Sequence, residues 1–309
     1  MKTTKLLILF LSISSICISQ NKSELLDSLF SSMNNRGQFY GNVLIAEHNE
    51  VLFSKSYGFS DRDKKELLNE ETLFNVGSVS KAFTAIAILQ LTEKEKIKLS
   101  DKVSKYLPDF PYDEITIHHL LIHAGGLPDD YELLFSNNWD NSKIATNKDV
   151  MSALIDQKPE LLFPAGDRSE YSKLGFIILA EIVKQVSESD FKEYLLRNIF
   201  EPAGMSRTNI FNAEEIKQVE NVAKGYVLYP FTGKYEEAII IPEFVSQYAT
   251  SGFQGDGNVY STTIDLFNFY KALSNNTLIK EHSQNIMFRK HIHARMEGTP
   301  DFGNSFGYG

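Results

Sequence analysis

The chain has 309 residues, and its 31 Lys and Arg residues against 40 Asp and Glu residues give a formal net charge of −9 at pH 7. An acidic chain lacks the positive field that attracts phosphate backbones, so the composition argues against a nucleic-acid partner. Hydrophobic residues make up 42% and charged residues 23% of the chain, proportions typical of a folded globular protein.

The first 19 residues are predicted to form a signal peptide. Lys2 and Lys5 give a positively charged start, and an apolar run follows over residues 6–18. This run is too short for a helix that crosses a bilayer, so we expect no membrane span. The sequence therefore predicts an exported protein, either periplasmic or secreted.

Cleavage is expected ahead of Gln20, because Cys17 and Ser19 are the small residues at positions −3 and −1. Cys17 is the only cysteine, so the mature chain would have none, which excludes a disulfide framework and a thiol nucleophile. A lipid anchor on Cys17 is the less favoured alternative, since Ile16 is an unusual residue before an anchored cysteine.

The next residues predict a helix followed by a hairpin. The residues after Asn21 have an amphipathic pattern whose apolar side carries Leu25, Leu26, Leu29 and Phe30. Two strand-like runs, 41–48 and 51–61, are separated by an Asn-Glu pair, which suits a hairpin.

Helical patterns predominate in the middle of the chain. A short helix is expected within 116–130, ended by Gly125-Gly126 and Pro128. The stretches that follow Lys81 and Leu174 are apolar on nearly every side, which is typical of buried helices. Strand character returns over 223–241, and a glycine-rich turn then leads into a helix at Ser261 or Thr262.

Early strands and a helical middle indicate an α+β fold, with one antiparallel sheet flanked by helices and a mainly helical lobe at about 96–225. Such a sheet should regain strands near the C-terminus, but the sequence ends at the strand-like run 304–309. We therefore expect the reading frame to continue past Gly309, so that the domain over residues 20–309 is incomplete and lacks its C-terminal strands.

Ser78 and Lys81 stand at the start of the first buried helix. Residues three apart share a helix face, and the first turn presents unpaired N–H groups and a partial positive charge. A serine hydroxyl needs a base to become a nucleophile, and a lysine can be that base where apolar surroundings favour its neutral amine. The Ser78 backbone N–H could then stabilise an oxyanion.

The S-x-x-K pattern alone leaves a structural alternative open. It occurs twice more, at Ser19/Lys22 and at Ser189/Lys192, and neither of those pairs leads into a buried helix. Ser78 could instead be a helix N-cap, with Lys81 extending into solvent from the first turn.

Five motifs extend the pattern along the chain. In order they are LFNVGSVSKAFTAIAILQL, ITIHHLLIHAGGLPD, FPAGDRSEYSKLGFIILAEIV, IFEPAGMSRT and GDGNVYSTTIDLFNF. In these motifs the chain resembles the β-lactamase-related serine hydrolases, which include class C β-lactamases, D-Ala-D-Ala carboxypeptidases and esterases. The resemblance covers about residues 39–309 and implies a β-lactamase/transpeptidase-like fold.

The resemblance also implies a function. It predicts a serine hydrolase that forms an acyl-enzyme with an ester, a D-amino-acid peptide or amide, or a β-lactam, without a metal or cofactor. The partner would be a small-molecule or peptide substrate, and the oligomeric state stays open. The alternative is a catalytically silent, penicillin-binding-protein-like domain that binds or senses such molecules.

The second motif that the resemblance implies is Tyr-x-Asn, and here it reads Tyr171-Ser172-Lys173. Tyr171 matches, and its phenol would relay a proton between Ser78, Lys81 and the leaving group; its structural alternative is an aromatic residue that caps the following helix. Lys173 departs from the pattern, because lysine only donates hydrogen bonds whereas asparagine also accepts them. We assign Lys173 a substrate-binding role and expect a narrowed or altered substrate range, with weak or no β-lactam turnover.

The family's third motif, Lys-Thr-Gly or His-x-Gly on an edge strand, has no match after Ser261, and its usual spacing would put it beyond Gly309. It normally supplies the second oxyanion donor, a contribution of about 10²–10³ in rate.

The remaining candidate residues are interpreted as structural. Three histidines of the second motif have no matched acidic residue that could complete a metal site: His118, His119 and His123. His291 and His293 are interpreted as surface residues. Asp256-Gly257 is predicted to form a tight turn near the site, with Asp265 at a helix cap or on the surface.

Overall fold

The computed structural model describes residues 22–128, 133, 139–230, 233–238, 246–293 and 305–308. The predicted signal peptide, residues 1–19, and the last residue, Gly309, lie outside these ranges. The chain divides into two compact units. The first unit contains the residues up to Leu73 with Asn221–Lys224 and Thr262–Ile264, and the second contains the remainder.

The first unit is built on a helix and a hairpin. The helix covers residues 22–35, and β1 (Gly41–Glu47) pairs antiparallel with β2 (Glu50–Tyr57), so the expected helix and hairpin are both present. Aromatic rings join them, because the Phe30 ring lies 6.1 Å from the Phe53 ring and 5.9 Å from the Tyr57 ring. The expected second strand is split, since β3 (Phe59–Asp61) pairs instead with β4 (Glu66–Leu67).

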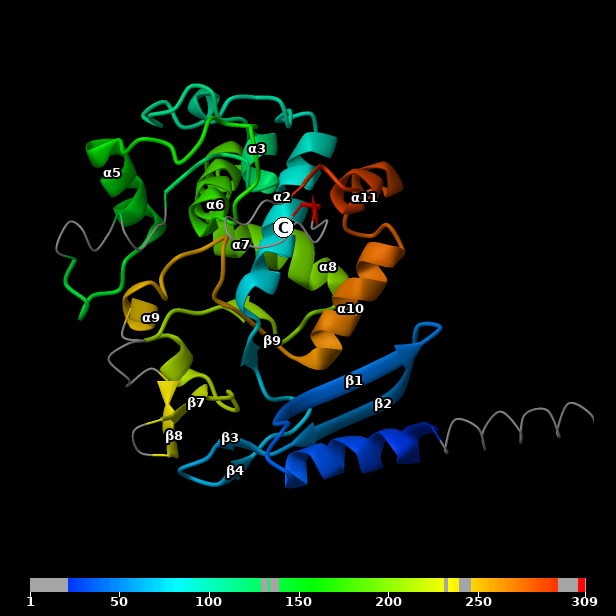
Figure 1. The fold of residues 1–309 in the computed structure, drawn as a ribbon. Coiled ribbons are helices and arrows are strands. Elements are labelled where there is room, and N and C mark those ends of the chain that lie inside the picture. The colour runs from blue at the N-terminus through cyan, green and yellow to red at the C-terminus, as the bar shows by residue number, and fades with distance from the viewer. Residues whose placement is uncertain are drawn as a thin grey trace, which may run out of the picture. The chain divides into compact units, whose positions relative to one another are not determined.

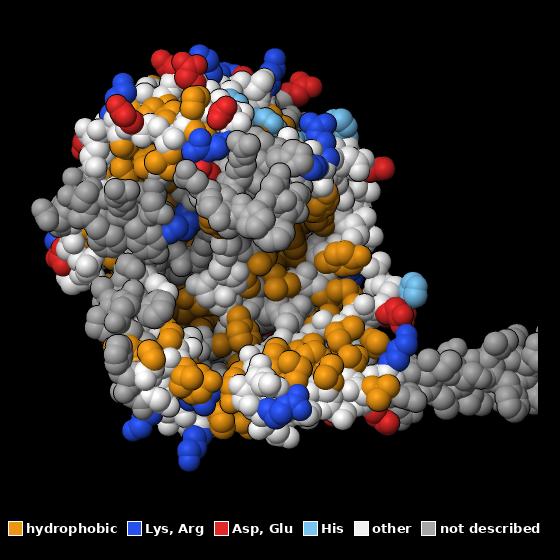
Figure 2. Space-filling model, viewed as in Figure 1, with side chains coloured by type: hydrophobic (Ala, Val, Ile, Leu, Met, Phe, Trp, Pro, Cys, Tyr) orange, Lys and Arg blue, Asp and Glu red, His pale blue; other side chains and the backbone are white. Residues whose placement is uncertain are grey.

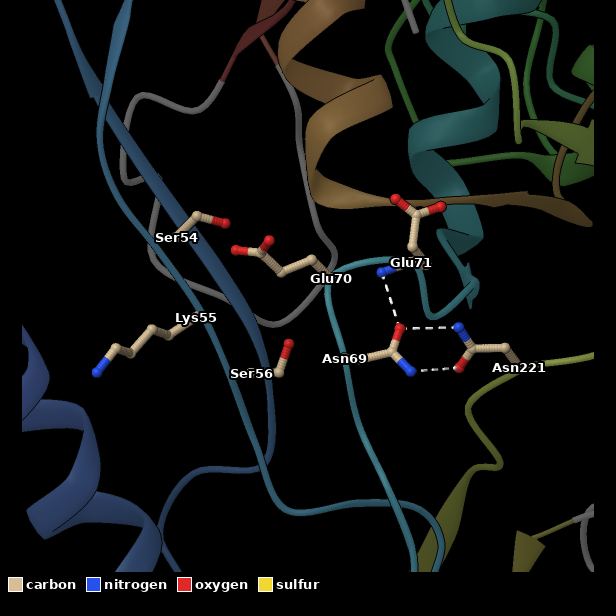
Figure 3. A pocket seen from close by; sticks show the side chains of 7 residues that line it. All are labelled: Ser54, Lys55, Ser56, Asn69, Glu70, Glu71 and Asn221. Atoms are coloured by element: carbon tan, nitrogen blue, oxygen red, sulfur yellow. Dashed lines mark hydrogen bonds between the residues drawn. The ribbon is translucent and has the colours of Figure 1, made fainter.

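A polar pocket lies within the first unit (Figure 3). On one side of the pocket the side-chain amides of Asn69 and Asn221 face each other. Asn221 Nδ2 donates to Asn69 Oδ1 at 2.8 Å. Its lining residues carry hydroxyl, ammonium, amide and carboxylate groups: Ser54, Lys55, Ser56, Asn69, Glu70, Glu71 and Asn221.

The helices after β4 follow the expected order, and short ones occur between them. Their bounds are α2 (Ser80–Glu93), α3 (Ile117–Leu121), α5 (Asn147–Gln157), α6 (Lys173–Ser187), α7 (Phe191–Leu195), α8 (Glu201–Ala203), α9 (Ser246–Ala249), α10 (Thr263–Ser274) and α11 (Glu281–Phe288). Single turns precede or link some of them: η1 (Gly77–Val79), η2 (Val103–Lys105), η3 (Leu196–Phe200) and η4 (Ile216–Gln218).

Helix α2 is the centre of the second unit. It is buried from Ser80 to Leu91 on almost every side, as its apolar sequence predicts. It packs against α6, α7 and α11, and Figure 1 shows it running through the middle of the helical part. The Phe83 ring meets those of Phe200 and Phe269 at centroid distances of 5.3 and 4.7 Å.

The arrangement of the strands into sheets differs from the single antiparallel sheet that was expected. The described strands form five small sheets instead of one, and every pair of strands in them is antiparallel. The sheet that matters for the site has the order β5–β9–β6, from Phe74–Asn75, Val259–Ser261 and Asn209–Ile210. Its strands are two or three residues long, and the chain turns after β5, where Gly77 N–H donates to Asn75 Oδ1 at 2.8 Å.

The other strands are two more pairs. Hairpin β7 (Tyr226–Tyr229) and β8 (Lys234–Glu237) falls where strand character was predicted to return. The strand expected at the end of the sequence is β11 (Ser305–Phe306), which pairs with β10 (Ile292–His293).

The surface and the helix lengths bear on possible partners. Within the described ranges, no helix has both the length and the apolar character that crossing a membrane requires. Figure 2 shows Lys and Arg side chains close to Asp and Glu side chains over the helical part, without a continuous basic stripe among the described residues on the face in view.

The loop that leads into β9 is held tightly, and this gives a test. Gly255 has φ +105°, and a Cβ there would overlap the Phe176 carbonyl oxygen. We expect Gly255→Ala to lower the free energy of unfolding by about 1–3 kcal/mol, because it combines backbone strain with a backbone clash. Urea unfolding of the purified protein measures this.

Gly257→Ala is the matched control two residues further on. A Cβ at Gly257 has nothing within 4 Å, so its effect should stay within about 0.5 kcal/mol. Equal effects of the two substitutions would contradict this account of the loop.

Candidate functional site

The position of Ser78 is set by a strand and a turn. After β5, Val76 N–H donates to the Val259 carbonyl on β9 at 2.9 Å. Gly77 adopts φ +53°, a left-handed conformation that favours glycine, and the chain then turns through η1 into α2. Ser78 therefore lies in the turn just before α2, two residues ahead of Ser80, the first residue of that helix, and it is exposed.

Lys81 lies in the first turn of α2 and is buried, with 1% of its surface exposed. Its Nζ donates to the Asp256 carbonyl oxygen at 2.6 Å and reaches Ser78 Oγ at 3.4 Å. The same atom lies 5.0 Å from the Tyr171 ring centroid and 5.7 Å from that of Phe176. The amine is thus held by one carbonyl, one hydroxyl and two aromatic rings.

The Asp256 carbonyl is held in place by side chains on two helices. Thr84 Oγ1, on α2, donates to the Gly255 carbonyl at 2.7 Å. Asn147, at the start of α5, donates to the Gln254 carbonyl at 3.1 Å and accepts from the Gln254 N–H at 2.8 Å. The backbone that carries the carbonyl acceptor is therefore fixed by the same helix that carries Lys81.

Tyr171 brings the third group into the cluster. It directly precedes the N-cap of α6, Ser172, whose hydroxyl accepts from the Gly175 N–H. The Tyr171 hydroxyl and Ser78 Oγ are 2.6 Å apart, and either can donate. Tyr171 is 46% exposed, so the phenol and the serine hydroxyl can both be reached from solvent.

Lys173 is the first residue of α6 and is half-buried. The contacts that join Ser78, Lys81 and Tyr171 to one another are made without it. Of the four predicted site residues, three are thus brought into mutual contact, and Lys173 follows two residues after the phenol.

His123 lies behind these groups, although the sequence suggested only a structural residue. It is 2% exposed. Burial and the neighbouring Lys81 charge lower the pKa of His123 to about 4, so its imidazole is neutral at pH 7. Its place within one of the five ordered motifs was the only sequence signal.

The structure differs from the two alternatives raised above, in which Ser78 is a helix N-cap and Lys81 extends into solvent. Helix α2 has Val79 as its N-cap and no side-chain cap there, and the Ser78 hydroxyl points to the phenol instead. Lys81 is buried instead of extending into solvent. At the other described S-x-x-K pair, Ser189 is partly buried and Lys192 forms an ion pair with Glu215 at 3.2 Å.

The other sequence candidates have structural contacts. Asp265 was expected at a cap or on the surface, but it is 2% exposed and accepts from the Arg207 N–H and Thr208 Oγ1. His118 bonds to the Tyr308 hydroxyl at 2.8 Å. Over the described part of the chain, no group of three or more His, Cys, Asp or Glu residues could hold a metal ion.

Comparison with known proteins identifies the family. A family model described as Beta-lactamase matches residues 26–309. This chain belongs to the beta-lactamase family. The match begins earlier than the resemblance inferred from the motifs, and it includes the Ser78, Lys81 and Tyr171 positions.

Two curated relatives of this chain are named as penicillin-binding proteins. Penicillin-binding protein 4* of Bacillus subtilis (strain 168) is 36% identical over 276 residues, which cover 88% of this chain and 60% of that protein. A putative penicillin-binding protein, PbpX, of the same strain is 30% identical over 275 residues, 88% of this chain and 61% of that protein. The chain therefore spans about three fifths of the length of these curated relatives.

The fold agrees with the family. The crystal structure of a penicillin-binding protein from Bacillus halodurans matches with a TM-score of 0.75 and 27% identity, over 90% of this chain and 80% of that one. The α+β, β-lactamase/transpeptidase-like fold and the membership of this family of serine hydrolases, both expected from the motifs, are confirmed.

The support for the Asp256 carbonyl can be tested by one substitution. Thr84 is fully buried, and its hydroxyl is bonded to the Gly255 carbonyl. Thr84→Val keeps the shape but leaves that carbonyl without this donor, so we expect a loss of about 1–3 kcal/mol in the free energy of unfolding. Chemical denaturation measures the difference.

The same helix provides the control. Thr92 donates to the Ile88 carbonyl at 2.9 Å, a bond made within one helical turn. Thr92→Val should change stability by less than about 0.5 kcal/mol, since the carbonyl is already part of the helix. A larger loss at position 92 than at position 84 would argue against the anchoring role of Thr84.

Proposed function

We propose that this chain is an exported serine hydrolase that works through an acyl-enzyme. The observation that carries the proposal is the position of the Ser78 hydroxyl, 2.6 Å from the Tyr171 phenol and 3.4 Å from the buried Lys81 amine. A serine with two possible proton acceptors in contact has what a nucleophile requires.

The proposed reaction starts with attack by Ser78 Oγ on a carbonyl carbon. As the new C–O bond forms, the hydroxyl proton passes to the neutral Lys81 amine, directly or through Tyr171. The oxyanion that develops is stabilised by the Ser78 backbone N–H at the start of the helix. Return of the proton to the leaving group breaks the old bond and leaves the acyl-enzyme, which water then hydrolyses.

Each side chain has one role in this scheme. Lys81 is the base, and the proposal requires its amine to be neutral when Ser78 attacks. A neutral amine can donate to the Asp256 carbonyl and accept from the Ser78 hydroxyl at once, as the two distances permit. Tyr171 relays the proton to the leaving group, because its hydroxyl contacts Ser78 Oγ and the residue is exposed to solvent.

The substrate is proposed to be an ester, a D-amino-acid peptide or amide, or a β-lactam. The relatives named penicillin-binding proteins support the β-lactam among these classes. Export is supported by the charged and apolar pattern of residues 1–19, and N-terminal sequencing of the protein recovered outside the cytoplasm should begin at Gln20.

The nucleophile can be tested with a fluorescent penicillin or a fluorophosphonate probe. We expect the wild type to be labelled covalently, and Ser78→Ala to abolish the label because no other hydroxyl in the described part of the chain contacts both a buried lysine amine and a phenol. Lys81→Met and Tyr171→Phe should slow labelling by at least about 10²-fold. Gel fluorescence over time measures all three.

Ser189→Ala is the matched control, since Ser189 and Lys192 repeat the same spacing but the Lys192 amine is paired with Glu215. Its labelling should equal that of the wild type. Absence of any label on the wild type would favour the alternative, a catalytically silent domain that binds peptides or cell-wall fragments.

The departure at Lys173 is proposed to narrow the substrate range. Lysine adds a positive charge and cannot accept a hydrogen bond, whereas asparagine could both donate to a substrate carbonyl and accept from the catalytic amine. We expect weak or no nitrocefin turnover by the wild type, and an increase of about tenfold or more in Lys173→Asn. Hydrolysis rates for nitrocefin and a p-nitrophenyl ester measure the change.

Lys184→Asn is the control for charge alone, because Lys184 is on the same helix with its side chain 53% exposed. It should leave both rates unchanged. Strong nitrocefin turnover by the wild type would defeat the proposed effect of Lys173.

A further inference from the structure

His123 occupies a conformation that a side chain seldom adopts. It follows α3 with φ +56°, in the left-handed region, where a residue with a Cβ is disfavoured by about 1–2 kcal/mol. Glycine would avoid this strain, so the imidazole is retained at a cost. Nine other described non-glycine residues also have a positive φ, so the task of this side chain has to be argued from its contacts.

The hydrogen bonds of His123 show what that task is. The Glu170 N–H donates to the His123 carbonyl at 2.9 Å. The Ser172 N–H donates to His123 Nδ1 at 3.1 Å. The residues on both sides of Tyr171 are therefore tied to one histidine, which fixes the backbone from which the phenol projects.

The imidazole also contacts the Tyr171 side chain directly. The two ring centroids are 4.7 Å apart, with an angle of 34° between the ring planes. On its other side the imidazole lies 5.1 Å from the Phe176 ring. Tyr171 and Phe176 are the two rings that face the Lys81 amine, so His123 packs against both walls of the amine site.

This arrangement requires a neutral imidazole. Nδ1 accepts the Ser172 N–H, so the ring proton resides on Nε2. The lowered pKa of His123, about 4, keeps this acceptor available at neutral pH.

We propose that His123 is a positioning residue that holds the Tyr171 hydroxyl against Ser78. It acts through the backbone on either side of Tyr171 and through contact between the two rings. The inference rests on the proposed function, in which Tyr171 relays the proton. It assigns His123 no contact with substrate.

Two substitutions separate the contributions of the acceptor and the ring. His123→Phe keeps an aromatic ring but removes the acceptor for the Ser172 N–H. His123→Asn keeps an acceptor at nearly the same place and tolerates a left-handed backbone, but it removes the ring. We expect His123→Phe to slow acylation about 10²-fold, the effect of a misplaced catalytic group, and His123→Asn to remain within about tenfold of the wild type.

The decisive measurement repeats His123→Phe in a Tyr171→Phe background. A residue that acts only through the Tyr171 hydroxyl has nothing left to position once that hydroxyl is gone, so the double variant should label no more slowly than Tyr171→Phe alone. The same fold-loss in both backgrounds, or no loss in the wild-type background, would overturn the proposal. Thermal unfolding confirms that each variant is folded.

A spectroscopic readout makes the test independent of activity. In protein labelled with 3-fluorotyrosine, the ¹⁹F signal that disappears in Tyr171→Phe belongs to Tyr171. We expect this signal to shift or broaden in His123→Phe and to stay in place in the control His282→Asn, which changes an exposed histidine on α11. If the wild type takes up no covalent probe but the Tyr171 signal shifts in His123→Phe, the proposed enzyme is rejected and the positioning role is kept. If the Tyr171 signal is unchanged in His123→Phe, the positioning role itself is rejected.

Discussion

The hydrogen bond from the buried Lys81 amine to the Asp256 carbonyl is the contact on which the site depends. A lysine nitrogen removed from water needs polar partners, because its lost hydration is otherwise uncompensated. One partner is a backbone carbonyl at 2.6 Å and another is the hydroxyl of Ser78. The rest of the local structure supplies the rigid backbone that keeps the carbonyl in place.

That support explains why distant segments converge on α2. Thr84, one turn after Lys81, bonds the loop residue next to Asp256, and Asn147 bonds the residue before that. Ser80, also on α2, accepts from the Val259 N–H at 3.3 Å. The helix that carries the amine is thus hydrogen-bonded to the loop that receives it, so the donor and its acceptor are held in one frame.

Sequence reasoning identified the groups that carry chemistry in their side chains. Ser78 and Lys81 were found from their spacing ahead of an apolar helix, and Tyr171 from the motif resemblance. The Asp256 carbonyl could not be found in this way, since every residue has a carbonyl and only the folded backbone selects one. His123 was missed for a related reason, because a buried histidine in a helical motif has the same sequence pattern whether it packs or positions a neighbour.

The strand pairings were also beyond the sequence. Local alternation located the β1–β2 hairpin, in which both partners are adjacent in the chain. It could not show that β5 pairs with β9, nearly two hundred residues away, or that such strands end after two or three residues. The bond from Gly77 N–H to Asn75 Oδ1, made where the chain turns after β5, is likewise absent from any periodic pattern.

The three groups differ in their access to bulk water, with Ser78 and Tyr171 exposed and Lys81 almost entirely enclosed. A molecule seated over the hydroxyl and the phenol would therefore cut the amine off from exchange with the medium. In a reaction of the proposed type, the proton taken from Ser78 would stay on Lys81 or Tyr171 until it is transferred to the leaving group. The water that hydrolyses the acyl-enzyme would return a proton to Ser78, so one turnover would need no proton from the medium.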